Sequence, residues 1–111
     1  MAHIEIADSF IEAAASLDAG DTKRAAAFID KLIHEPDALG IHAEIVRDAR
    51  DRSIRSMRIT KDIRAIAHIN GDRILLLYVA QHDTAYRWAR NHCVECHPVT
   101  GELTVVALGT Q

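Results

Sequence analysis

The sequence predicts an α+β fold in which an N-terminal helical hairpin packs on a small antiparallel sheet. Apolar residues recur three and four positions apart in the first third of the chain, which is the spacing of amphipathic helices. Residues 53–80 instead hold alternating or continuous apolar runs of strand length, and Asn70-Gly71 separates two of them as in a tight hairpin. Helices grouped ahead of strands are typical of the α+β class.

The first third is expected to hold one short strand and two helices. Residues 3–6 alternate between polar and apolar side chains, which predicts the strand. The expected caps are Asp8 or Ser9 for the first helix and Asp21 or Thr22 for the second, since these side chains accept from free backbone N–H groups. The first helix is expected to end at residues 18–20. The second should end at Glu35-Pro36, because the residue before proline avoids the α region.

The rest of the chain is expected to build the sheet. The predicted strands are residues 53–60, 63–69, 73–80 and 103–108, with a short helix at 85–91 and a strand or turn at 44–46. Residues 47–52 mix basic and acidic side chains, which predicts a solvated loop. Because residues 74–79 are apolar on both faces, we expect strand 73–80 to lie inside the sheet, covered on both sides.

Composition indicates one ordinary globular domain spanning residues 1–111. The chain is 49% hydrophobic and 26% charged, close to the average for soluble domains. No apolar run approaches the ~18 residues of a membrane span, and the N-terminus lacks the basic-then-apolar pattern of a secretory signal. We therefore expect a cytoplasmic protein whose two cysteines are free thiols, unless a metal or redox role holds them.

The charge is unevenly distributed along the chain. The net charge is −3, but residues 1–46 carry three Lys/Arg against nine Asp/Glu, whereas residues 47–90 carry ten against five. Basic clustering is an electrostatic footprint for a polyanion such as nucleic acid. The alternative is that the two halves simply attract each other in the fold. The negative total argues against tight nonspecific binding of nucleic acid.

The segment from Arg55 to Tyr86 resembles the RelE/ParE toxin superfamily. An arginine-rich strand leads to Asp62-Ile63-Arg64-Ala65-Ile66, then to the hairpin and an apolar strand, and finally to His82-Asp83 and Tyr86. Residues 78–89 look especially like a subgroup whose members also occur fused to the front of UvrD-type helicases. The resemblance covers roughly residues 3–108 and implies the RelE-like α+β fold.

The resemblance also implies an activity and partners. It implies a ribosome-dependent mRNA endonuclease that works without a metal or other cofactor and is held inactive by a cognate antitoxin. The branch that resembles ParE instead poisons DNA gyrase and has no nuclease chemistry. The expected partners are therefore an antitoxin, the ribosome with its mRNA, or a helicase.

Three residues are the catalytic candidates. Metal-free RNA cleavage needs a base for the 2′-OH, an acid for the leaving oxygen and cations for the phosphate. Arg64 matches the family position that binds the scissile phosphate; the alternative is an arginine paired with an acidic residue of the helical hairpin. His82 can transfer protons near neutral pH, although the common family pattern has arginine there; the alternative is a capping or solvent histidine. Tyr86 can stack on a base or donate to phosphate, or it anchors the short helix.

Arg55, Arg58 and Lys61 are the RNA-binding candidates. They lie along one basic stretch next to the catalytic candidates. The alternative is that an exposed edge strand carries these charges to prevent pairing with other chains. Glu44, just ahead of this stretch, is a further candidate for the general base.

Cys93-Val-Glu-Cys96-His97 matches the haem-attachment pattern by letter, and with His92 it supplies four soft ligands. Haem attachment needs export, and four ligands within six residues would strain one tetrahedral site. We expect no metal here and interpret the segment as a loop after the short helix.

Two hypotheses of different classes follow. The first is a RelE-like mRNA endonuclease with Arg64 on the phosphate and His82 or Tyr86 in proton transfer. The second is a binding or regulatory module that keeps the toxin fold without nuclease activity, attached to or acting with a helicase or another partner. The negative net charge and the histidine at position 82 favour the second; the basic run favours the first.

Overall fold

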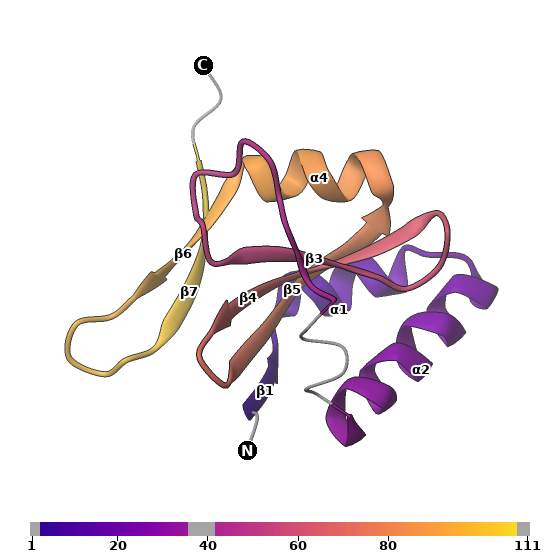
Figure 1. The fold of residues 1–111 in the computed structure, drawn as a ribbon, viewed down its shortest axis with the longest axis horizontal. Helices are drawn as coiled ribbons and strands as arrows, with labels where there is room; N and C mark the ends of the chain where they lie inside the picture. The colour runs from indigo at the N-terminus through magenta and orange to yellow at the C-terminus, as the bar shows by residue number, and fades with distance from the viewer. Residues whose placement is uncertain (1–2, 36–41, 109–111) are drawn as a thin grey trace.

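The computed structural model describes residues 3–35 and 42–108. Its helices are α1 (Asp8–Ala15), α2 (Ala19–His34) and α4 (His82–Arg90). Its strands are β1 (His3–Ile6), β2 (Glu44–Ile45), β3 (Ile54–Arg58), β4 (Ile63–Asn70), β5 (Arg73–Gln81), β6 (His92–Cys96) and β7 (Leu103–Ala107) (Figure 1). Pro36, the expected end of the second helix, lies outside the described residues.

The main sheet has five strands in the order β1-β5-β4-β3-β2. Strands β2 to β5 pair antiparallel as predicted, and β5 lies inside the sheet between β1 and β4. β1 pairs parallel to β5, so the sheet is mixed. A strand of four residues carries no signal for its direction, because direction follows from how the intervening chain crosses the sheet. The α+β class is confirmed.

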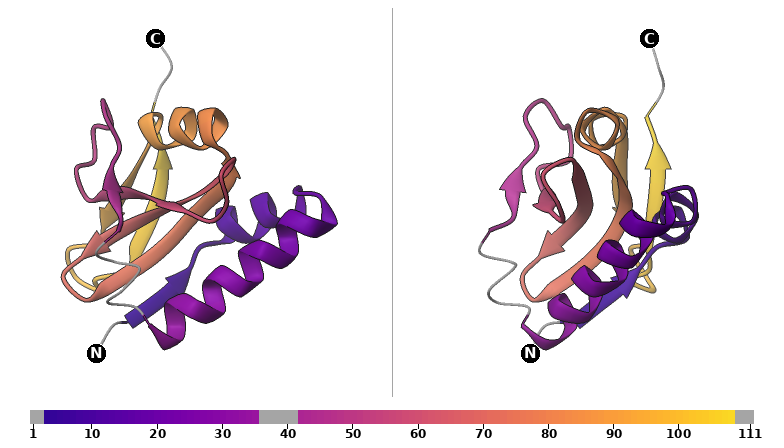
Figure 2. Two further views of the ribbon diagram at one scale, coloured as in Figure 1. Left: turned by 45° about the vertical axis from the view of Figure 1, so that its right-hand side comes forward. Right: turned by 90° about the vertical axis from the view of Figure 1, so that its right-hand side faces the viewer.

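Helices α1 and α2 cover one face of this sheet, which we call the α1–α2 face. Phe10, Phe28 and Leu32 from the two helices pack with Met57 and Leu76 from the sheet. All five side chains are buried. This is the predicted arrangement of a helical hairpin on a sheet, and Figure 2 shows both helices on the same side.

Helix α4 and a separate β6–β7 hairpin cover the opposite face, which we call the α4 face. Ala85 and Ala89 of α4 are fully buried against a cluster that includes Ile66 and Leu77. The predicted last strand is confirmed as β7, but it pairs with β6 and not with the main sheet. β6 was not predicted: residues 92–96 form a strand and not a loop.

A bulge in β5 determines which face of the sheet the side chains near the end of the strand occupy. Ile66 pairs with Tyr78, whereas Ala67 pairs with Leu76, so Leu77 is the extra residue. Leu77 and Tyr78 therefore both contribute to the core on the α4 face. Beyond the bulge the register places Ala80 opposite Arg64.

The helix starts differ from the predicted ones. Ala7 precedes α1 without a side-chain cap, and the Ser9 hydroxyl instead donates to the carbonyl of Leu77 at 2.5 Å. Asp18 caps α2 by accepting from the Asp21 N–H at 2.8 Å. The predicted caps of both helices were therefore wrong. Asp18 was predicted to lie at the end of the first helix, but it caps the start of the second. The two positions are easily confused because only two residues separate the C-cap of α1 from α2.

The β4–β5 turn and the start of α4 lie at opposite ends of the β4–β5 ladder. Asn70 pairs with Arg73, so Gly71 and Asp72 form the two-residue loop of the predicted hairpin. Gly71 has φ +61°, a conformation that glycine adopts without steric cost. Helix α4 begins at His82 and not at Ala85, the predicted start, so His82 is its first residue.

No helix within the described ranges is long and apolar enough to cross a membrane.

Candidate functional site

Arg58 and Arg64 lie directly opposite each other on β3 and β4. Residues opposite each other in a sheet share a face, and alternation puts both arginines on the side of Ile54 and Ile66, which is the α4 face. Like charges placed opposite each other are unfavourable unless an anion compensates them. Neither arginine lies within 4.0 Å of a carboxylate oxygen in the described part of the chain. The arginine pair therefore carries two positive charges without a carboxylate partner in the described part of the chain.

The β3–β4 loop orients the Arg64 guanidinium. Its Nη1 donates to the carbonyls of Thr60 at 2.8 Å and of Lys61 and Ile63 at 3.2 Å. No hydrogen bond within the described residues engages its Nε or Nη2. Arginine binds phosphate through two parallel donors of its planar fork, so the bonds at Nη1 leave a usable edge.

A small hollow of about 100 Å³ surrounds the arginine pair, and we call it the arginine pocket. Its lining residues are His42, Glu44, Ser56, Arg58 and Arg64. Glu44 pairs with Ser56, so the carboxylate of β2 lies on the α4 face together with the two arginines. A larger hollow of about 410 Å³ adjoins it and shares His42, Glu44 and Arg58. That volume is within the range of ordinary ligand sites.

His82 and Tyr86 form a second cluster at the start of α4. Their rings stack with centroids 4.2 Å apart and planes inclined by 28°. The His82 Nδ1 lies 3.1 Å from an oxygen of Asp83, whose side chain is 95% exposed. An Nδ1–H that donates to this carboxylate leaves Nε2 as the free acceptor. The two rings are one turn apart on the helix, and Tyr86 is also half-buried against the core of the α4 face.

The β3–β4 loop connects the two clusters. The His82 backbone N–H donates to the Asp62 carbonyl at 2.8 Å, and the preceding loop carbonyls hold Arg64. His82 lines a separate hollow of about 220 Å³ with Asp62, Gln81 and Asp83. The arginine pocket and the His82 hollow are therefore neighbours anchored on one loop, and they are not one cavity.

The RNA-binding candidates do not lie together. Alternation along β3 directs Arg55 to the opposite face from Arg58. The Arg55 guanidinium donates to the carbonyls of Arg52 and Ile54, toward the 47–53 loop. Lys61 is exposed in the β3–β4 loop beside the arginine pocket. Arg58 and Lys61 are thus close to the catalytic candidates, and Arg55 is directed away.

Sequence reasoning missed His42 and gave Glu44 only a minor place. Both lie near β2, which is two residues long and exists because it pairs with β3. The available signal was the acidic Glu44, which lies just ahead of the basic strand β3 in the sequence. No local pattern could show that the chain returns to the sheet edge at this point.

Asp51 and His68 form a polar cluster under the β6–β7 hairpin. The Asp51 carboxylate accepts from the backbone N–H groups of Ser53 and Val94, both at 3.0 Å. The His68 Nε2 lies 4.0 Å from the same carboxylate, and its residue is only 8% exposed. Burial lowers the pKa of His68, opposed by the charge of Asp51 and assisted by Arg73. Asp51 thus ties a loop and the hairpin to the sheet.

The two cysteines belong to β6 and not to a loop. Cys93 is half-buried and Cys96 is exposed, and both are free thiols. Residues three apart on a strand point to opposite faces, so the two sulfurs diverge. Burial raises the pKa of the Cys93 thiol, and Glu95 and Asp51 act in the same direction. Across residues 3–35 and 42–108 no group of three or more His, Cys, Asp or Glu side chains is arranged to hold a metal ion.

The chain is similar in fold to several solved structures. Sequence comparison finds no matching family model and no matching curated relative. YafQ from Escherichia coli strain BL21(DE3) matches with TM-score 0.60 and 11% identity, and the E. coli DinJ–YafQ complex with 0.56 and 12%; each match covers 76% of this chain and 97% of the other. HP0894 from Helicobacter pylori matches with TM-score 0.55 and 15% identity, over 75% of this chain and 97% of the other. About a quarter of this chain lies outside these matches. The chain therefore has the RelE-like α+β fold seen in YafQ.

Proposed function

We propose that this chain is the toxin of a toxin–antitoxin pair and cleaves mRNA on the ribosome without a metal ion. The observation that carries the proposal is the arginine pair: two arginines lie opposite each other on β3 and β4 and line one pocket, with no carboxylate oxygen within 4.0 Å among the described residues. A phosphodiester is an anion that would relieve their repulsion. The toxin fold and the basic run of residues 47–90 support the same proposal.

The reaction we propose is attack of the ribose 2′-OH on the adjacent phosphorus. The O–P bond to the 5′-oxygen of the next nucleotide breaks, the 2′-OH proton goes to a base, and the leaving oxygen takes a proton from an acid. Arg64, with Arg58, binds the nonbridging phosphate oxygens and stabilises the negative charge of the transition state. His82 transfers a proton, and Tyr86 holds its ring by stacking or stacks on a base.

The order of the strands supports separate roles for Glu44 and His82 in proton transfer. Glu44 on β2, the arginine pair on β3 and β4, and His82 after β5 follow one another across the sheet. An in-line displacement needs the entering and leaving oxygens on opposite sides of the phosphorus. A phosphate on the arginine pair would have Glu44 or His42 on one side and His82 on the other. We propose Glu44 as the base and His82 as the acid.

The proposed partner that silences the toxin is an antitoxin protein. One solved structure similar to this chain is a complex of YafQ with DinJ, which supports a protein partner for this fold. The ribosome and mRNA are partners of the proposed reaction.

The test is a translation reaction with purified ribosomes and a defined mRNA, with cleavage ends mapped by primer extension. We expect cleavage in the ribosomal A site, lost in Arg64→Ala and His82→Ala and retained in Arg24→Ala. Arg24 is a matched control because it is an exposed arginine on α2 paired with Asp21. Absence of cleavage at protein levels equal to the ribosomes, with the fold intact, would exclude the nuclease.

The second candidate is a module without nuclease activity, acting on a helicase, another partner or, like ParE, DNA gyrase. The histidine at position 82 and the negative net charge favour it. The same reaction separates the two candidates, because this module leaves the mRNA intact. A supercoiling assay with purified gyrase then shows whether the module acts on gyrase or on another partner.

A further inference from the structure

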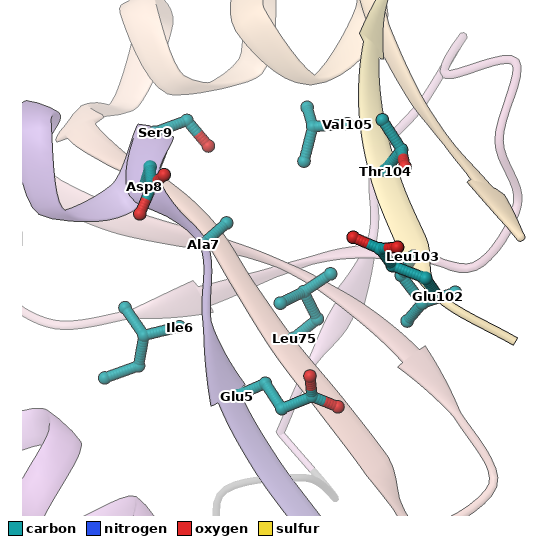
Figure 3. Close-up of a pocket in the computed structure, with 10 residues that line it drawn as sticks. All are labelled: Glu5, Ile6, Ala7, Asp8, Ser9, Leu75, Glu102, Leu103, Thr104 and Val105. Atoms are coloured by element: carbon teal, nitrogen blue, oxygen red, sulfur yellow. The ribbon is translucent and has the colours of Figure 1, made fainter. Parts of the chain in front are cut away.

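A further hollow, separate from the arginine pocket, lies where residues 5–9 approach residues 102–105 (Figure 3). It measures about 410 Å³, with residues 5–9 on one side and residues 102–105 of β7 on the other. Leu75 of β5 contributes to its floor, and Leu103 and Val105 add further apolar surface. We call it the β7 groove.

Within residues 3–35 and 42–108, one edge of β7 borders this groove without a pairing strand. β7 pairs with β6 on its other edge, and no residue of β6 lines the groove. Backbone hydrogen bonds join Leu108 to Asn91 and His97 to Glu102 at the two ends of the hairpin. Because bonded pairs alternate in an antiparallel ladder, the N–H and C=O groups of Leu103 and Val105 point to the unpaired edge.

A two-stranded sheet gains from a third strand. An isolated pair of strands is marginally stable, and an unpaired edge is a template for an added strand. A segment lying along β7 would hydrogen-bond to Leu103 and Val105. Every second side chain of that segment would face the apolar floor of the groove.

The rim of the groove is acidic. Its charged lining residues are Glu5, Asp8 and Glu102, and no lysine or arginine lines it. The negative charge of Glu5 is compensated, since its carboxylate lies 3.0 Å from Arg73 and 3.3 Å from His3. Asp8 and Glu102 have no cationic side chain within 4.0 Å in the described part of the chain. An occupant with basic side chains would complement them.

We propose that the β7 groove binds an extended segment of a protein partner in which apolar residues alternate with lysine or arginine. The segment adds to β7 as the third strand of the small sheet. Its apolar side chains cover Leu75 and Val105, and its basic side chains meet Asp8 and Glu102. The arginine pocket is not involved, so this inference holds whether or not the chain cleaves RNA.

The test uses a short fluorescein-labelled peptide that alternates valine with lysine, and a second peptide that alternates valine with glutamate. Fluorescence anisotropy with the full chain should give an affinity at least about tenfold higher for the lysine peptide. Amide signals of Leu103 and Val105 in NMR spectra should shift on its addition. Equal affinity for the two peptides, or unshifted signals at these residues, would overturn the proposal.

Three variants make the test specific. Asp8→Lys with Glu102→Lys should weaken binding of the lysine peptide about tenfold, whereas the exposed control Glu35→Lys should leave it unchanged. Val105→Pro keeps every charge and removes a donor only at the unpaired edge, where proline is tolerated. It should also weaken binding, with the Val94 amide signal reporting an intact hairpin. Equal weakening by Glu35→Lys would mean nonspecific attraction and would refute a defined groove.

Discussion

Arg58 is exposed and Arg64 is half-buried, and neither lies within 4.0 Å of a carboxylate oxygen in the described part of the chain, so their positive charges are available to a ligand. The arginine pocket also brings Glu44 and His42 to the same face, although neither lies near the arginines in the sequence. The residue types needed for metal-free phosphodiester cleavage therefore meet at one end of the sheet. Which of them acts can be decided by substitutions that preserve shape.

Arg64→Lys is expected to lose most of the proposed nuclease activity while the free energy of unfolding stays nearly unchanged. Lysine keeps the positive charge but cannot meet two phosphate oxygens with parallel donors. Loss of one such contact costs about 10²–10³ in turnover. Single-turnover cleavage on programmed ribosomes and urea unfolding would measure the two effects. Activity equal to wild type would mean that Arg64 acts only as a point charge.

His68 is expected to make stability fall as the pH falls. Burial lowers its pKa in the folded chain below the unfolded value of about 6.5, so the unfolded chain binds the extra proton more readily. The stability is therefore complete above pH ~6.5 and decreases from there down to the folded pKa, with a slope of at most about 1.4 kcal/mol per pH unit.

Urea unfolding of wild type and His68→Gln across pH 5–8 would measure this slope. The glutamine variant should be less pH-dependent in that window. His34→Gln, on the exposed surface of α2, is the matched control and should leave the slope unchanged. Parallel pH profiles for wild type and His68→Gln would contradict the assignment.

At the scale of elements, the hairpins and helices that depend on local patterns could be read from the sequence. The α2 stripe, the turn at Gly71 and the apolar run of β5 each carry their own signal, and all three were predicted. β6 was not predicted, and residues 44–46 were assigned only as a strand or a turn, because β2 and β6 each become a strand only through a partner elsewhere in the chain. Arg58 and Arg64 were each named as candidates, but their pairing across β3 and β4 was not predicted. Glu44 was named only as a further candidate for the base, and His42 was not named.

The Asp51 carboxylate is expected to hold the β6–β7 hairpin on the sheet. Asp51→Ala removes the acceptor of the Ser53 and Val94 N–H groups and should cost about 1–3 kcal/mol, because buried donors lose their partner. Hydrogen exchange of the Val94 amide should accelerate more than that of the β4 amides. Arg50→Ala, in the same loop but exposed, is the control. An unchanged Val94 exchange rate would show that the apolar contacts alone hold the hairpin.

Ala89 is expected to set how closely α4 approaches the sheet. It is fully buried, so Ala89→Leu must push the helix outward or distort the core, at a cost of about 1–3 kcal/mol. The same helix carries His82, so cleavage should fall as well. Arg87→Leu adds the same side chain on the exposed side of α4 and should do neither. Thermal unfolding with the ribosome assay would compare the two variants.

At the scale of the whole molecule, the acidic helices and the arginine pair lie on opposite faces of the sheet. The acidic first third forms α1 and α2 on one face of the sheet, whereas the arginine pair lies on the other face. The arginine pair does not face the acidic helices, so attraction between the two halves of the chain does not account for it, and binding of a polyanion stays a prediction. A local site on an acidic chain should bind RNA with few ionic contacts.

The affinity for a single-stranded oligoribonucleotide should therefore depend only weakly on salt. With Arg58, Lys61 and Arg64 as the contacts, the logarithm of the affinity should fall against the logarithm of salt concentration with a slope near −2, since each contact to a single strand contributes about −0.7. Arg58→Ala with Arg64→Ala should reduce the slope to about −0.7, and Arg24→Ala should leave it unchanged. Fluorescence anisotropy between about 50 and 200 mM salt would measure it. A slope much steeper than −2 would mean that RNA contacts further basic side chains, with Arg55 and the 47–53 loop the next ones to substitute.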